Sequence, residues 1–323
     1  GYAYTDRRQF YVLSVATANW GYEWRVKNKI WKYTPLNIEV YNLDTLQLLR
    51  DAFLSNPFLR TAFNTGSVVS QNLSLTINTT GKRNPNINHF KRIFIEEAGT
   101  LAGVVPALRR QIYRYLKLEA EYRQRIVLTP KTSIAFRAMA GIGYNYNRLA
   151  GKDSSLPFFK QFVAGGPNSM RAWGLRQLGL GSSLLSDTSS TFRDRFGDVQ
   201  LEFNAEYRFT VANIGGLKLG SAFFIDAGNI WNLKRTAGNP NAEFNFNRLY
   251  QDLAIAMGTS VRLDFDYFLI RVDFGYKVKD PARLANNGWM SIKDFTWQNY
   301  EFASPTRPVR NNFAFQLGIG LPF

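Results

Sequence analysis

The chain has 323 residues, 15% of them aromatic, and a formal net charge of +16 at pH 7. It has no cysteine and one histidine, His89, which excludes disulfide bonds, thiol catalysis and cysteine-ligated zinc and argues against a Ser-His-Asp triad. The basic residues are spread along the chain, so anionic lipid headgroups or lipopolysaccharide are expected neighbours and nucleic acid is not.

Segments of alternating polar and apolar residues run along the chain and predict about twelve strands. Residues 28–33 are expected to be a turn. Residues 45–63 break the alternation and predict a short helix within a loop insertion. The expected strands span residues 1–6, 9–27, 34–43, 67–79, 90–103, 111–128, 132–147, 197–209, 217–231, 249–264, 267–279 and 312–323.

Strand length and loop asymmetry favour a membrane barrel over a soluble sandwich. Many of the expected strands reach the roughly ten residues needed to cross a bilayer at a tilt. Short expected turns alternate with long loops near 44–64, 148–196 and 280–310. We therefore predict an all-β fold, a transmembrane antiparallel β-barrel that forms a single domain over residues 1–323. The side chains expected to face lipid are Leu201, Phe203, Phe274, Phe313 and Leu317.

Residues 162–181 form the most distinctive stretch, which we call the arginine loop. Its glycines and proline exclude a regular helix or a central strand. Arg171 lies in its middle and needs an acidic partner to be held in place. Glu206 and Asp226 fall on the polar faces of the next two strands, so they are the expected partners in the lumen.

The neighbours of Arg171 have expected roles as well. Gly165 and Gly166 permit a sharp backbone turn, and Met170 and Trp173 should pack against the inner wall. Other interpretations remain open at this point: Arg171 could be an exposed loop cation, and Glu206 and Asp226 could be ordinary lumen carboxylates.

Three motifs in this order resemble those of the BamA/TamA superfamily of outer-membrane assembly and translocation barrels. They are GGPNSMRAW at 165–173, GDVQLEFNAEYRF at 197–209 and FFIDAGNIW at 223–231. The last residue, Phe323, resembles the aromatic C-terminal signal of outer-membrane proteins. Ala172 stands where the family usually has glycine, and Trp173 where it often has Phe or Tyr. The MRAW motif at 170–173 and residues 19–25 are most similar to sequences of the TamA-like branch called TamL.

The resemblance implies a protein of the bacterial outer membrane with a long loop folded into the lumen. Family barrels have sixteen strands and periplasmic POTRA domains, so we expect the first strands and the POTRA domains to be absent from this stretch. The implied function is insertion or export of nascent outer-membrane or surface proteins through a lateral seam, without any cofactor or enzymatic reaction. A TamB-like periplasm-spanning protein is an implied partner. On the last strand the implied seam residues are Phe313, Phe315, Gly318, Gly320 and Phe323.

Two other functions are compatible with parts of this pattern. A two-partner secretion transporter would carry the same kind of arginine loop and thread one dedicated exoprotein through the lumen. A plain porin or adhesin would have the barrel, but the arginine loop argues against it.

Overall fold

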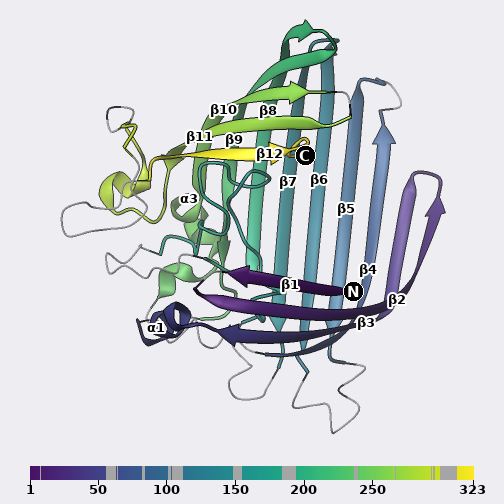
Figure 1. The fold of residues 1–323 in the computed structure, drawn as a ribbon, viewed down its shortest axis with the longest axis vertical. Coiled ribbons are helices and arrows are strands. Elements are labelled where there is room, and N and C mark those ends of the chain that lie inside the picture. Colours follow the sequence, from purple (N-terminus) through teal and green to yellow (C-terminus); the bar gives the residue numbers. More distant parts are fainter. Residues whose placement is uncertain are drawn as a thin grey trace.

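The computed structural model describes residues 1–7, 9–55, 63, 65–81, 84–100, 103, 112–147, 155–183, 194–235, 239–265, 267–291, 293, 295–298 and 311–323. These residues form one antiparallel sheet of twelve strands, paired in sequence order and curled into a barrel wall (Figure 1). In the described part of the chain, no helix has both the length and the apolar character needed to span a membrane. The strands are β1 (Tyr2–Arg7), β2 (Tyr11–Val26), β3 (Lys29–Thr45), β4 (Gly66–Thr80), β5 (Ile87–Ala98), β6 (Tyr115–Thr129), β7 (Thr132–Asn145), β8 (Val199–Ile214), β9 (Leu217–Trp231), β10 (Ala254–Asp264), β11 (Leu269–Lys279) and β12 (Phe313–Ile319).

The number of strands and the barrel architecture confirm the prediction, but several boundaries differ. The expected turn over 28–33 is wrong, because β3 starts at Lys29 and only two residues join it to β2. Trp24 and Trp31 stack across that hairpin at 6.3 Å, and this cross-strand contact extends the pairing toward the turn. Residues 249–252, expected to be strand, form the short helix α3 (Leu249–Asp252).

The expected helix within 45–63 is present as α1 (Gln47–Ser55). The rest of that prediction, from residue 56 to 62, lies outside the described residues. Three short 3-10 helices, η2 (Pro240–Ala242), η3 (Phe246–Arg248) and η4 (Ala285–Gly288), lie in the connections after β9 and β11. Apart from the three residues between β1 and β2, the connections at the α1 end of the barrel are long, and those at the other end, such as the one between β6 and β7, are short (Figure 1).

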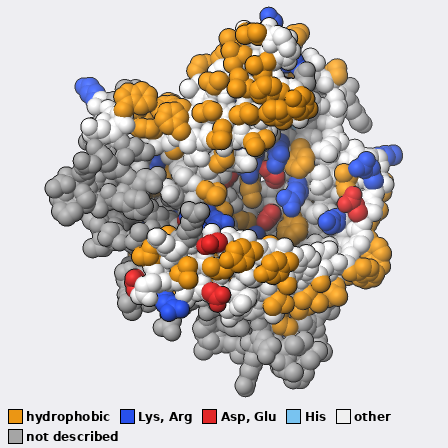
Figure 2. All heavy atoms as spheres, viewed as in Figure 1, with side chains coloured by type: hydrophobic (Ala, Val, Ile, Leu, Met, Phe, Trp, Pro, Cys, Tyr) orange, Lys and Arg blue, Asp and Glu red, His pale blue; other side chains and the backbone are white. Residues whose placement is uncertain are grey.

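The two faces of the wall differ as the alternation predicts. On β8, Glu202, Asn204 and Glu206 are buried, whereas Phe203 between them is 47% exposed. Figure 2 shows charged side chains gathered in the hollow and hydrophobic side chains over the surrounding wall. A soluble sandwich would have its apolar face inside, so this arrangement is that of a transmembrane barrel, with polar residues in the lumen and apolar residues toward lipid.

Phe313 is an exception among the five side chains predicted to face lipid. Phe203 and Leu317 are exposed on the outer face, and Leu201 and Phe274 are partly exposed there. Phe313 is only 8% exposed, because Phe295 and Trp297 of the connection before β12 cover its ring, with centroids at 6.1 and 5.8 Å. The prediction that Phe313 faces lipid is therefore wrong.

The face assignment can be checked with one charge on the outer wall. Phe203→Arg should lower the free energy of unfolding by about 2–4 kcal/mol, the cost of a cation on the lipid face near the midplane. Asn19→Arg, on the exposed lumen side of β2, is the control and should have little effect. Heat resistance of the folded barrel on semi-native gels measures both. Equal losses for the two variants would contradict the assignment of faces.

Candidate functional site

The arginine loop makes a closed turn inside the barrel. Gly165 and Gly166 have φ angles of +103° and +94°, which L side chains rarely adopt. A Cβ on Gly165 would lie 2.2 Å from the carbonyl oxygen of Gly174, so only glycine fits there. The Gly166 amide donates to the Trp173 carbonyl over 2.9 Å and closes the turn. The predicted need for two glycines at this point is confirmed.

Arg171 projects from the turn onto the wall and pairs with Asp226 and Glu206, as predicted. Its Nε and Nη2 donate to the two carboxylate oxygens of Asp226 over 2.9 and 2.7 Å, and its Nη1 donates to Glu206 over 3.2 Å. The backbone amide of Arg171 also donates to Asp226. The side chain is 1% exposed, so the alternative of an exposed loop cation is wrong. A bidentate, charge-assisted pair shielded from water fixes both the position and the orientation of the loop.

Apolar contacts support the ion pair. The ring of Phe224 lies under the guanidinium, with 3.5 Å from its centroid to Arg171 Cζ. Met170, Ala172 and Trp173 are buried in one cluster with side chains of the wall, which confirms the expected packing of Met170 and Trp173. Ala172, the departure from the family pattern, also fits there.

Glu202 is a further point of contact between loop and wall. It accepts a hydrogen bond from Ser169 of the loop and one from Arg137 Nη1 on β7, the latter over 2.7 Å. Arg137 in turn reaches Glu121 on β6 over 2.6 Å. The loop is therefore tied to the charged network of four neighbouring strands, β6 to β9.

The loop also reaches the last strand, through contacts that the sequence does not reveal. Arg271 on β11 donates to the Pro167 carbonyl over 2.7 Å and to the Gly320 carbonyl over 3.0 Å. Gln316 on β12 donates to the Trp173 carbonyl over 3.0 Å. A Cβ on Gly318 would meet the Arg271 guanidinium at 2.7 Å, so this glycine makes room for the link.

The segment before the arginine loop is anchored on the opposite wall by Lys160. Its Nζ lies 3.0 Å from Glu39 on β3 and 2.9 Å from Glu96 on β5. The two phenylalanines that precede it are packed as well: Phe158 lies in a buried hydrophobic cluster, and Phe159 stacks on Tyr41 with ring centroids 3.5 Å apart. The loop thus fills the lumen between two walls. A lysine directly after two phenylalanines is the sequence feature that marks this second anchor.

The predicted seam residues do not all lie as expected. Phe313 and Phe315 are on β12, facing outward, and Gly318 lies on its lumen side. Gly320, however, is outside the strand, with a φ of +80°, because β12 ends at Ile319. The chain then turns into the lumen, where Arg208 Nη2 donates to Phe323 O over 3.0 Å and lies over its ring. The expected last strand, 312–323, is therefore too long at its end, because Phe323 lies in the lumen and not on the strand.

Asp198, just before β8, holds three segments together. It accepts hydrogen bonds from the backbone amide of Leu156 over 3.0 Å, from Gln161 Nε2 over 3.2 Å and from the backbone amide of Leu233 over 3.3 Å. Burial raises the pKa of Asp198 to about 6, although these hydrogen bonds act in the opposite direction.

This pKa predicts a pH dependence of loop docking. A carboxyl group with a raised pKa in the folded state stabilises the fold in its protonated form, so its contribution is complete below about pH 4 and is lost as the pH rises to about 6. The loss is about 3 kcal/mol at most. Limited proteolysis of the loop across this range should show more protection at the acid end. In Asp198→Asn the protection of the loop from protease should no longer depend on pH. If protection in this variant changed with pH as in the wild type, the role given to Asp198 would be wrong.

Within the described ranges, no group of three or more His, Asp or Glu side chains is placed to hold a metal ion. What the site offers is a set of charged and apolar contacts that hold a loop against the barrel wall and its last strand.

Comparison with known proteins identifies relatives of this architecture. A family model described as the Omp85 superfamily domain matches residues 41–323. The fold is similar to the crystal structure of BamA from Haemophilus ducreyi lacking POTRA domains 1-3, with a TM-score of 0.59 at 14% identity over 98% of this chain and 57% of that chain. It is also similar to CdiB from Escherichia coli, with a TM-score of 0.50 at 11% identity over 85% of this chain and 44% of that one.

No curated protein matches the sequence. At these identities the two structures show a shared fold, and the chain spans little more than half of the first and less than half of the second.

Proposed function

The chain belongs to the Omp85 superfamily, and on that premise we propose that it inserts or exports other proteins at the bacterial outer membrane. Within the superfamily we propose that it belongs to the TamA-like branch, TamL, because its arginine loop contains the motif MRAW at 170–173. In this proposal the short turns face the periplasm and the long loops the outside, as in other outer-membrane barrels.

One observation carries the proposal: the arginine loop is held on the wall beside the last strand. Arg171 binds Asp226 and Glu206, and Arg271 and Gln316 connect the same loop to β12 and the residue that follows it. A loop that only narrowed a pore would not need contacts to β12. We infer that β12 lines a lateral seam, where an extended client strand can add to the sheet edge by backbone hydrogen bonding.

The clients in this proposal are nascent outer-membrane or surface proteins, and a TamB-like periplasm-spanning protein is the proposed partner. A two-partner secretion transporter is the second candidate, since the arginine loop suits both. A plain porin is disfavoured by the lumen itself, which buried loop residues such as Phe158 and Trp173 occupy.

Reconstitution distinguishes these functions. The full-length protein in liposomes should raise the rate at which an unfolded outer-membrane β-barrel becomes heat-resistant on semi-native gels, compared with liposomes that contain a porin. A porin function would instead give a steady single-channel conductance and no rate increase. Acceleration of one dedicated exoprotein's passage, without barrel folding, would favour two-partner secretion.

A further inference from the structure

The charges in the lumen are layered along the barrel axis. Toward the short turns, acidic side chains give way to arginines on three strands that line the lumen. On β10, Arg262 faces the same region, and the acid beyond it, Asp264, is the direct cross-strand neighbour of Lys218. In order toward the short turns, the charged side chains on these three strands are Glu119, Glu121, Arg123 and Arg125 on β6; Glu202, Glu206 and Arg208 on β8; and Asp273 and Arg271 on β11.

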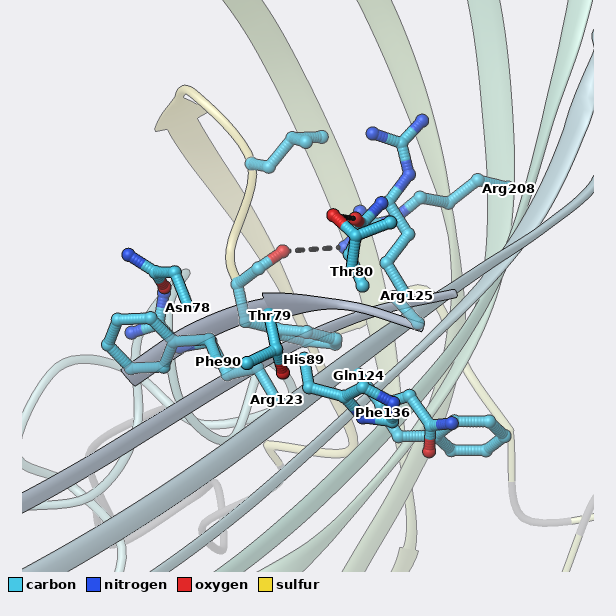
Figure 3. A pocket seen from close by; sticks show the side chains of 14 residues that line it. Asn78, Thr79, Thr80, His89, Phe90, Arg123, Gln124, Arg125, Phe136 and Arg208 are labelled. Carbon is cyan, nitrogen blue, oxygen red and sulfur yellow. Dashed lines mark hydrogen bonds between the residues drawn. The ribbon is translucent and has the colours of Figure 1, made fainter. Parts of the chain in front are cut away.

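Two adjoining cavities open among these arginines. One has a volume of about 350 Å³ and lies against β4 to β8, and the other, of about 250 Å³, extends toward β10. Both are lined by Arg125, Arg208 and Leu321. Figure 3 shows the side chains of Arg125 and Arg208 reaching into the same space.

The cations around this space are short of acidic partners. Glu206 lies within ion-pair distance of three guanidinium groups, those of Arg171, Arg208 and Arg262. Arg208 is 7% exposed, and its Nε has no hydrogen-bond partner among the described residues. In the same part of the chain, no carboxylate lies within ion-pair distance of Arg125. Excess positive charge in a sheltered cavity is costly, and a bound anion would relieve that cost.

We propose that the turn end of the lumen binds an acidic polypeptide segment. The arginines are spread over β6, β8 and β10, which suits an extended chain with several carboxylates better than one small anion. The planar guanidinium group pairs with a carboxylate through two parallel hydrogen bonds. Phe90, Leu321 and Phe323 line the larger cavity and add apolar contacts for side chains between the acids.

The direction of entry follows from what occupies the rest of the lumen. The arginine loop and the Lys160 anchor fill the end next to the long loops, so the segment enters from the side of the short turns. This inference deepens the proposed function, because it names the charge of the client or partner segment that the barrel receives.

The test is direct binding to the full-length protein, measured by fluorescence anisotropy with a short labelled peptide in which Glu alternates with Phe. The same peptide with Gln in place of Glu is the charge control. Arg125→Gln should weaken binding of the Glu peptide about tenfold or more, the equivalent of one lost charge-assisted pair. Added salt should weaken it as well. Lys29→Gln removes an exposed charge on the outer face at the same end and should have no effect.

Because Arg125 has no carboxylate partner among the described residues, Arg125→Gln should fold normally, and heat resistance on semi-native gels verifies this. Equal binding of the Gln peptide, or equal weakening by Lys29→Gln, would overturn the inference. Displacement of the peptide by inorganic phosphate, or by anionic lipid vesicles, at comparable concentrations would assign the site to phosphate groups instead. Binding is measured without any insertion assay, so failure here is distinct from failure of the proposed function.

Discussion

Replacing Asp226 with alanine should lower the free energy of unfolding by about 3–5 kcal/mol and release the arginine loop from the wall. The variant leaves the Arg171 guanidinium buried without its bidentate partner. It also leaves the Arg171 amide without an acceptor and reduces the hydrogen bonds of Asn204 Nδ2 to the one it donates to the Ser169 carbonyl. Glu206 cannot compensate, because it is already shared with Arg208 and Arg262.

A double-mutant cycle separates the stability of this pair from its function. Arg171→Met combined with Asp226→Leu removes both charges and keeps apolar bulk, so it should be more stable than either single variant. It should nevertheless stay inactive in barrel insertion, because the loop has lost its directional anchor. Glu23→Ala, an exposed acid on β2, is the control. The prediction would be contradicted if Asp226→Ala kept the heat resistance of the wild type and the same protection of its loop from protease.

The parts of the fold that the sequence predicts correctly depend on local periodicity. On β8 the alternation has a period of two, and burial follows it residue by residue from Gln200 to Arg208. The pairing of Arg171 with Asp226 could be predicted for a related reason. A buried cation requires an acid, and strict alternation puts only a few acids on the lumen side of the next two strands.

What could not be predicted depends on contacts between residues far apart in the chain. Nothing near Lys160 indicates that Glu39 and Glu96 lie on the strands opposite it. Phe313 continues the apolar alternation of its strand, yet a connecting segment covers it. The last strand ends early because Gly320 turns the chain inward, where Arg208 binds Phe323. Periodicity predicts on which face of the sheet a residue lies, but it does not predict which loop residues pack against that face.

The contacts between loop and last strand predict the effect of locking the seam. Gln316 and Arg271 place the arginine loop against β12, so movement of β12 and the loop should be coupled if clients enter there. Leu317→Cys combined with a cysteine on the strand that faces β12 across the seam should abolish client insertion when oxidised. The barrel itself should remain folded, and reduction should restore the wild-type rate. The 323-residue chain has no cysteine that could interfere.

Val272→Cys with Leu317→Cys is the matched control for this crosslink. These two residues are direct neighbours across β11 and β12, and both are exposed on the outer face, so a disulfide between them ties strands that are already paired. Each oxidised protein carries one disulfide on the last strand. The disulfide of the test variant closes the seam, whereas that of the control leaves the seam free to open. The control should therefore insert clients at the wild-type rate. If the protein with the locked seam did the same, clients would have to pass by another route, and the link between the arginine loop and β12 would serve only the stability of the barrel.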